Sequence, residues 1–222
     1  SRVEPGTAIV QLVGPAGSLL SAERVSLNFL GHLSGVATQA RRFVAAVEGL
    51  PVAICDTRKT TPGMRRLEKY ATVCGGGQNH RIGLFDEVLL KENHLRAAGL
   101  SIGRAIERCR ESLTEAGRET STPIGAEATS LEELDEALAV RPDLVLLDNF
   151  EVETAREAVA RRDRSAAATG HRVTLEATGG MSLRTVRSYA EIGVDRISIG
   201  AITHSAPVLD LSCLFDWSTL DR

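Results

Sequence analysis

No stretch of the sequence is apolar over the roughly 18 residues that a membrane-spanning helix needs, and no segment resembles a signal peptide. Cysteine is scarce, and Cys55, Cys74, Cys109 and Cys213 show neither a CxxC pair nor the Cys/His spacing of a zinc site. Basic residues are not in excess, because the net charge is -3, which argues against a large nucleic-acid-binding surface. We therefore expect reduced thiols, a cytoplasmic location, and no nucleic-acid or membrane partner.

The length and composition are those of an ordinary globular protein. A chain of 222 residues can bury a substantial core, so one domain with a small appendage is expected. Apolar residues make up 43% and charged residues 25%, and there is neither an internal repeat nor a low-complexity linker. The function must therefore be sought in particular residues.

After residue 50 the chain alternates short apolar runs with amphipathic segments. The expected strands are Val52–Cys55, Val88–Leu90, Ile124–Ala128, Leu144–Leu147, Val173–Ala177 and Arg196–Ile199. The expected helices are Met64–Cys74, Ile102–Ala116, Leu131–Ala139, Val152–Arg161 and Leu183–Ile192. This alternation indicates a parallel sheet covered by helices. Near-regular βα units with polar strand ends favour a (β/α) barrel, closed or nearly so, over an open doubly wound sheet.

The first 50 residues follow a different pattern. One apolar run, Ala8–Val13, is bounded by Pro5-Gly6 and Gly14-Pro15 and is expected to be a strand. A lone strand must pair with another strand or another chain. Ser21 is then expected to cap a long core helix, in which Gly31 and Gly35 indicate either close packing or a break between two helices.

Positively charged residues gather in the segment Asp56–His94. They follow two expected strands and a run of three glycines, and they are Arg58, Lys59, His80, Arg81 and Lys91. A single charged residue at a strand end is often only a solvated loop residue. Five cations brought together by strand ends and a glycine turn instead indicate a site for carboxylates or phosphates.

Two acids occupy the ends of later strands. Glu127 lies on the strand at Ile124, and Asp148 ends the neighbouring apolar run at Leu144. Acids beside cations suit ribose hydroxyls, a magnesium ion or a positively charged transition state. The alternative is that each acid only pairs with a neighbouring lysine.

The last two strands end in small residues. One runs into Thr178-Gly179-Gly180, and the other runs into Gly200-Ala201, with His204 close behind. Backbone N–H groups at two such adjacent turns form a phosphate-binding site at the place usual for a barrel. Cations, acids and amide groups together describe one composite ligand, an aromatic acid beside a phosphoribosyl group.

Several long motifs resemble one known family. They are TRKTTPG at 57–63, GGGQNHRIGL at 75–84, LLKENH at 89–94, LLDN at 146–149 and GAITHS at 200–205. These motifs, and nearly the whole chain from residue 23 onward, are similar to the quinolinate phosphoribosyltransferases. The resemblance implies transfer of phosphoribosyl from phosphoribosyl pyrophosphate (PRPP) to the ring nitrogen of quinolinate, with loss of carbon dioxide and pyrophosphate. It also implies Mg²⁺ and a homodimer in which the N-terminal sandwich of one subunit covers the barrel of the other.

The resemblance also assigns residues. The positions that match the family's carboxylate and pyrophosphate contacts are Arg58, His80, Arg81 and Lys91. Lys59 lies between the aromatic acid and the sugar phosphate, and Glu127 and Asp148 match the acids that hold the ribose hydroxyls and the metal. Lys59, Glu127 and Asp148 are therefore the expected catalytic residues. The expected 5′-phosphate site consists of Thr178, Gly179, Gly180, Gly200, Ala201 and His204.

Three departures from the family pattern keep alternatives open. The family's arginine before the ERVSLN helix, which grips quinolinate across the dimer, is replaced by Gly17. The first glutamate of its Glu-Val-Glu strand is replaced by Gly125, and the family residues that would precede Ser1 are absent. We expect an incomplete α/β barrel over residues 21–205, with residues 1–20 and 206–222 as the remnant of an N-terminal α/β sandwich. The acceptor is quinolinate or another aromatic or pyridine acid; a catalytically impaired sugar-phosphate-binding paralogue or partner subunit is the third possibility.

Overall fold

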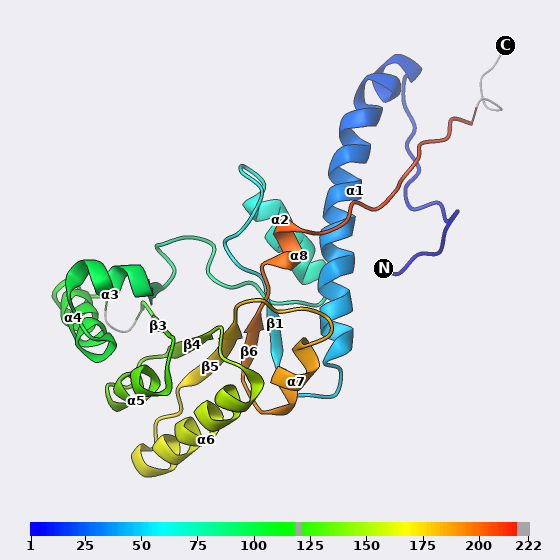
Figure 1. The fold of residues 1–222 in the computed structure, drawn as a ribbon. Coiled ribbons are helices and arrows are strands. Elements are labelled where there is room, and N and C mark those ends of the chain that lie inside the picture. Colours follow the sequence, from blue (N-terminus) through cyan, green and yellow to red (C-terminus); the bar gives the residue numbers. More distant parts are fainter. Residues whose placement is uncertain (119–120, 217–222) are drawn as a thin grey trace.

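Six parallel strands form the centre of the computed structural model, which describes residues 1–118 and 121–216 (Figure 1). The strand order is β1-β6-β5-β4-β3-β2. The strands are β1 (Ala53–Cys55), β2 (Val88–Leu90), β3 (Ile124–Ala128), β4 (Leu144–Asp148), β5 (Thr174–Thr178) and β6 (Arg196–Ser198). All six expected strands are confirmed to within a residue at each end. The expected barrel is confirmed as an incomplete one, in which β1 and β2 are the two edges of the sheet.

Helices cover the outside of this curved sheet. They are α1 (Ala16–Ala46), α2 (Arg65–Cys74), α3 (Glu92–Ala98), α4 (Ile102–Glu115), α5 (Leu131–Ala139), α6 (Val152–Thr169), α7 (Val186–Glu191) and α8 (Ala201–His204). Helices α4, α5, α6 and α7 each pack against the next, and α1 packs against α2, α7 and α8 (Figure 1). Right-handed βα crossovers place successive helices side by side in this way.

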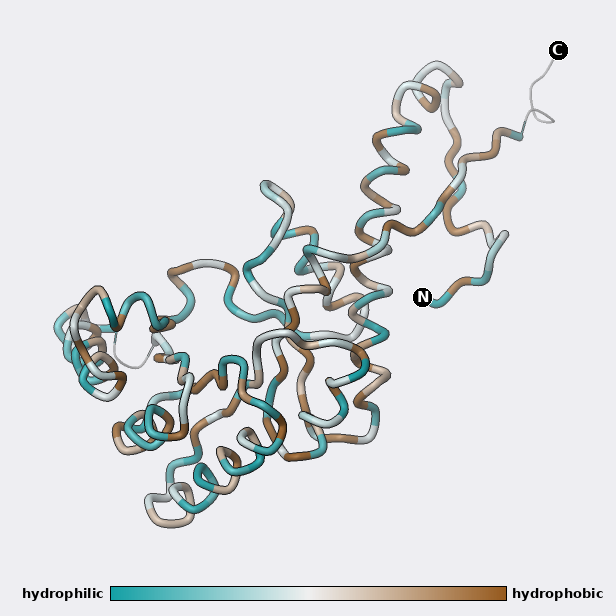
Figure 2. The backbone as a smooth tube through the Cα atoms, in the orientation of Figure 1, coloured by the Kyte–Doolittle hydropathy of each residue, from teal (hydrophilic) through white to brown (hydrophobic). Residues whose placement is uncertain are grey.

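The two faces of the sheet differ in chemistry. Because side chains alternate along a strand, Val145 and Leu147 face the helices and belong to the main hydrophobic core. Leu144 and Leu146 face the barrel interior, where they form a small separate cluster with Leu89. Figure 2 shows hydrophilic and hydrophobic residues alternating along the surrounding helices. Among the described residues, no helix is long and apolar enough to span a membrane.

Helix α1 begins earlier than the sequence pattern indicates. Ser21 is not its cap, because the helix starts at Ala16 after Pro15, whose φ of -59° already suits a helical start. The Ser21 hydroxyl instead donates to the Gly17 carbonyl at 2.7 Å, inside the first turns. The helix is unbroken, and Gly31 and Gly35 serve close packing. A Cβ at Gly35 would lie 2.0 Å from the carbonyl oxygen of Pro207.

The expected strand Ala8–Val13 is wrong. These residues form no strand and are exposed, because both edges of the sheet lie elsewhere and no described segment offers them a pairing partner. The C-terminal segment crosses α1, where the Leu209 amide donates to the Gly31 carbonyl at 3.0 Å. The division at residues 20 and 205 stays a prediction; α1 runs through the first boundary, and residues 217–222 lie outside the described chain.

We expect Gly75→Ala to lower the free energy of unfolding by about 1–3 kcal/mol, because overpacking forces backbone shifts. A Cβ at Gly75 would stand 2.3 Å from the Ala37 carbonyl oxygen and 2.6 Å from the Ala40 Cβ, so α1 and α2 would have to separate. Urea unfolding measures this change. Gly103→Ala is the control, since its nearest neighbour would be 3.4 Å away. Equal stability of the two variants would contradict the close approach of the helices.

Candidate active site

All six strands are parallel, so their carboxyl ends meet at one mouth of the barrel. Lys59 follows β1, Lys91 follows β2, and Glu127 lies near the end of β3. Asp148 ends β4, and it is in register with Thr178 at the end of β5. The expected site residues of these strands therefore lie at the same end of the fold.

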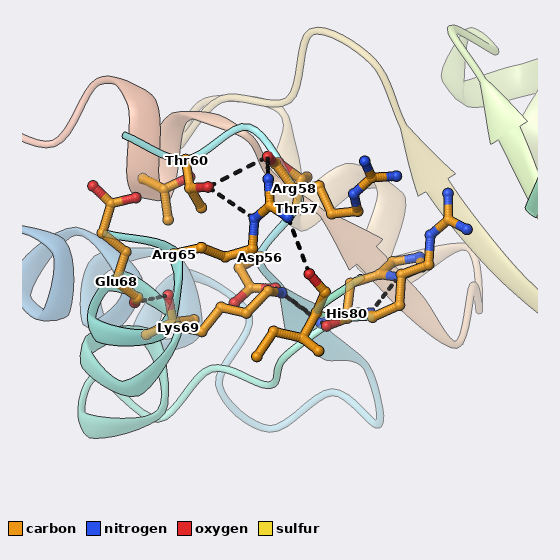
Figure 3. A network of polar contacts seen from close by, with 12 residues as sticks. Asp56, Thr57, Arg58, Thr60, Arg65, Glu68, Lys69 and His80 are labelled. Carbon is orange, nitrogen blue, oxygen red and sulfur yellow. Dashed lines mark hydrogen bonds and ion pairs between the residues drawn. The ribbon is translucent and has the colours of Figure 1, made fainter. Parts of the chain in front are cut away.

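Helix α2 holds the turn that carries the first cations (Figure 3). The Arg65 guanidinium donates to the Thr60 hydroxyl at 3.1 Å and to the Ile82 carbonyl at 3.2 Å. Glu68, which is fully buried, accepts from the Thr61 amide at 3.1 Å. These bonds tie the turn after β1 to the loop after the triple glycine, and they fix the backbone from which Arg58 and Lys59 project.

A buried ion pair lies beneath that turn (Figure 3). Lys69 Nζ is 2.5 Å from Asp56 Oδ1 and also donates to the His80 carbonyl at 2.8 Å. The His80 amide donates to the same Asp56 oxygen at 2.9 Å. Burial raises the pKa of Asp56, and the bond from Lys69 opposes this rise. The network therefore anchors His80 against the end of β1. Removing either charge would leave the other charge buried without a partner.

His80 points into the barrel interior with an exposed fraction of only 9%. Its Nδ1 accepts from the Arg81 amide at 2.7 Å, which leaves Nε2 facing the Glu176 carboxylate at 3.4 Å. Burial lowers the pKa of His80, but Glu176 and Glu87 outweigh burial, and the net direction is upward. Glu176 is fully buried on β5. Burial next to this acid also raises the pKa of Cys55 to about 12, so that thiol is inert.

Two of the expected cations are without protein partners for their charge. In the described part of the chain, no carboxylate lies within ion-pair distance of Arg58 or Lys59, and Arg58 Nε is buried without a hydrogen-bond partner. Lys91, by contrast, is paired with Glu127, and Arg81 donates to the Glu87 carbonyl at 2.9 Å. Unpaired cations beside a fixed turn are available to an anionic ligand.

The two glycine turns lie next to the acids and the lysine. A Cβ at Gly179 would be 2.2 Å from Asn149 Oδ1, so glycine is required beside the end of β4. A Cβ at Gly200 would be 2.9 Å from His204 Nε2 and 3.1 Å from Lys59 Cδ. Within the described residues, the amides of Gly179, Gly180 and Gly200 find no acceptor in the protein. These free N–H groups suit a phosphate, and Lys59 lies directly against one of the turns.

Some residues join the site without having been predicted, and one expected position lies far from it. Glu176 and Glu87 are buried acids of the barrel interior, and neither was predicted as a site residue. For Glu176, the sequence signal is an acid within the apolar run TLEAT. Gly17 lies in the first turn of α1, exposed, at the end that projects away from the sheet (Figure 1). No group of three or more potential metal ligands occurs among the described residues.

A parallel, incomplete α/β barrel with unpaired cations and amides at its carboxyl-terminal mouth is the architecture of a barrel protein that can bind an anionic ligand at that mouth. Sequence comparison is more specific: the model of the quinolinate phosphoribosyl transferase C-terminal domain matches residues 36–213. The chain belongs to the quinolinate phosphoribosyltransferase family.

Named relatives agree with this assignment. The chain is 44% identical over 211 residues to nicotinate-nucleotide pyrophosphorylase (carboxylating) of Mycobacterium leprae, covering 95% of this chain and 70% of the relative. It is 41% identical over 207 residues to the probable enzyme of that name from Bacillus subtilis, covering 93% and 67%. The crystal structure of NadC from Streptococcus pyogenes superposes with a TM-score of 0.78 at 38% identity, over 89% of this chain and 65% of that chain. The chain thus spans about two thirds of the length of these relatives.

Proposed function

We propose that this protein transfers the phosphoribosyl group of PRPP to the ring nitrogen of quinolinate, giving nicotinate mononucleotide, carbon dioxide and pyrophosphate. This is a pentosyl transfer in the biosynthesis of NAD. The names of the relatives support the proposal. The observation that carries it is that the unpaired Lys59 lies against the Gly200 turn, whose free amide can bind a phosphate.

The cations take the acid and the pyrophosphate. Arg58, His80 and Arg81 lie on the side of the mouth fixed by α2 and the Asp56–Lys69 pair. Lys91 extends this side toward Glu127. Arginine binds carboxylates and phosphates through paired N–H groups, so these residues hold the carboxylates of quinolinate and receive the pyrophosphate as it leaves.

The acids and turns hold the sugar. Glu127 and Asp148 accept hydrogen bonds from the ribose hydroxyls and stabilise the positive charge that develops on the ribose when its bond to pyrophosphate breaks. Lys59 stands between acid and sugar and neutralises the departing pyrophosphate. The 5′-phosphate is bound by the amides and side chains of Thr178, Gly179, Gly180, Gly200, Ala201 and His204. The lone pair of the pyridine nitrogen then forms the new bond to the ribose. The carboxylate on the ring carbon next to that nitrogen leaves as carbon dioxide, and the electron pair left on the carbon takes up a proton.

Magnesium fits this donor set in the way usual for phosphate substrates. Mg²⁺ is generally held by one or two carboxylates together with substrate phosphates, and Glu127 and Asp148 are on adjacent strands of the same interior face. When bound, the ion neutralises charge on the pyrophosphate group of the substrate. Lys91 pairs with Glu127 and so holds that carboxylate in place at the mouth.

A homodimer in the cytoplasm completes the proposal. The N-terminal segment and the first half of α1 carry exposed apolar side chains, among them Val10, Leu12, Val13, Leu20, Val25 and Phe29. Exposed apolar side chains gathered along one segment in this way indicate an interaction site. We infer that a second copy covers it, which brings the Gly17 end of α1 to the partner's mouth. The cytoplasmic location rests on four cysteines that are all free.

Gly17 favours a second candidate, namely transfer to a different aromatic or pyridine acid. The position lacks the arginine that the family pattern provides, and nothing lies within 4 Å of where its Cβ would be. A third candidate is a sugar-phosphate-binding protein without turnover. The presence of both Glu127 and Asp148 speaks against it, since a binding protein gains little from keeping both acids.

Incubating the protein with PRPP, Mg²⁺ and a panel of pyridine and benzoic acids tests these candidates. We expect pyrophosphate release with quinolinate and a product with the mass of nicotinate mononucleotide. Release with another acid only would support the second candidate. Thermal stabilisation by PRPP without product from any acid would identify a binding protein, because a ligand that binds only the folded state stabilises it without turnover.

A further inference from the structure

Glu87 is a buried acid that the sequence pattern does not assign to the site. It lies directly before β2, and only 9% of it is exposed. Its Oε1 atom is buried and has no hydrogen-bond partner within the part of the chain described. Burying a carboxylate oxygen without a partner is unfavourable, so this acid calls for an explanation other than stability.

The side chain occupies a space that Gly125 leaves open. A Cβ at Gly125 would stand 2.9 Å from Glu87 Oε1 and 3.1 Å from Leu89 Cδ1, both on the neighbouring strand's side. Gly125 lies two residues before Glu127 on β3, so both face the barrel interior. Any larger residue at position 125 would displace the Glu87 carboxylate. The Glu87 carboxylate therefore fits here only because Gly125 on β3 has no side chain.

The carboxylate is surrounded by charges of both signs. Burial raises the pKa of Glu87, and His80 and Arg81 oppose this rise. Burial lowers the pKa of Arg81, and Glu87 opposes this fall. Together with Glu176, Glu87 also opposes the effect of burial on the pKa of His80. Arg81 is also held by its bond to the Glu87 carbonyl at 2.9 Å. The charged groups that face His80 from all sides are Asp56, Lys69, Glu87, Glu176 and Arg196.

We propose that Glu87 is a positioning residue for the acid substrate: its carboxylate fills the space over Gly125 and supplies the negative charge beside the His80 and Arg81 side chains that bind the acid. The proposal rests on the function proposed above. It also explains why the glutamate expected at position 125 is absent. The interior keeps one negative charge at this place, but the charge comes from the residue before β2 instead of from β3.

Kinetics of Glu87→Gln test the proposal, because glutamine preserves shape and removes charge. We expect KM for the aromatic acid to rise about tenfold, the size of one weakened charge-assisted contact. We expect the melting temperature to stay near that of the parent. Glu115→Gln, at the exposed end of α4, is the matched control. A lower melting temperature with unchanged KM would overturn the proposal, because it indicates a structural role only.

A double-mutant cycle tests the shared space. Gly125→Ala should raise KM for the acid in the parent, but it should add nothing in the Glu87→Gly background, where the space is free. The exchange Glu87→Gly with Gly125→Glu should restore most of what Glu87→Gly loses. Additive losses, or an exchange no better than the single variant, would overturn the proposal.

A readout without turnover separates this inference from the proposed function. In an NMR titration of the imidazole Cε1–H signals, His80 should titrate at lower pH in Glu87→Gln than in the parent, because a carboxylate that favours its charged form is gone. An unchanged His80 titration would overturn the inference. If the parent formed no nucleotide from any acid, the proposed function would fall while this titration still decided the role of Glu87.

Discussion

Replacing Lys59 by alanine is expected to abolish detectable turnover, with kcat lowered by at least about 10²–10³-fold, as when an electrostatic contact to a transition state is removed. The backbone of Lys59 is fixed by the Thr203 hydroxyl, which donates to its carbonyl at 2.7 Å. Its side chain passes the Gly200 turn, and no described carboxylate neutralises it. The charge is therefore available to an anionic ligand, and in the proposed reaction it would face the departing pyrophosphate.

Pyrophosphate release measures this effect, and melting temperature confirms that the variant is folded. Arg66→Ala is a matched control, since Arg66 is an exposed cation on α2 without an ion-pair partner among the described residues. Near-normal release by the Lys59 variant would refute its catalytic role. A large rise in KM with normal kcat would assign Lys59 to ground-state binding only.

The sequence predicts the barrel and most of its mouth for one physical reason. In a parallel sheet all strand ends meet at the same edge, so the residue after each strand, such as Lys59 or Lys91, can be placed from the strand pattern alone. The order of the strands then follows from short right-handed crossovers. The resulting arrangement of Asp148 beside Thr178 agrees with the observed register.

The interior acids were not predictable in the same way. Glu176 and Glu87 are defined by what they face across the barrel, and a sequence pattern records only which residues are near one another along the chain. Gly125 illustrates the limit. Alone it indicates a missing glutamate, and only its distance to Glu87 Oε1 relates the two positions. Local patterns also fail for Ala8–Val13, an apolar run that finds no pairing partner among the described residues.

Gly17→Arg is expected to raise kcat/KM for quinolinate by about tenfold to hundredfold if quinolinate is the acceptor. A charge-assisted contact to a carboxylate contributes about 1.5–3 kcal/mol, and 1.36 kcal/mol corresponds to a factor of ten. The position accepts the change, because Gly17 has helical neighbours, no positive φ, and no atom within 4 Å of its Cβ position. Arginine is also a better helix former than glycine.

The effect should act on the partner's site and not on the chain's own. Gly17 lies at the end of α1 that projects away from its own sheet (Figure 1), so mixing Gly17→Arg chains with Lys59→Ala chains separates the two possibilities. In a mixed dimer, the Lys59→Ala chain contributes no active site, so only the site of the Gly17→Arg chain turns over. If the arginine acts across the dimer, that intact site faces the glycine of its partner. Its kcat/KM then falls back toward the parent value. Gly17→Ala controls for helix stabilisation and should leave quinolinate kinetics unchanged. No gain from arginine with quinolinate, together with turnover of another acid by the parent, would show that Gly17 belongs to a site adapted to that acid.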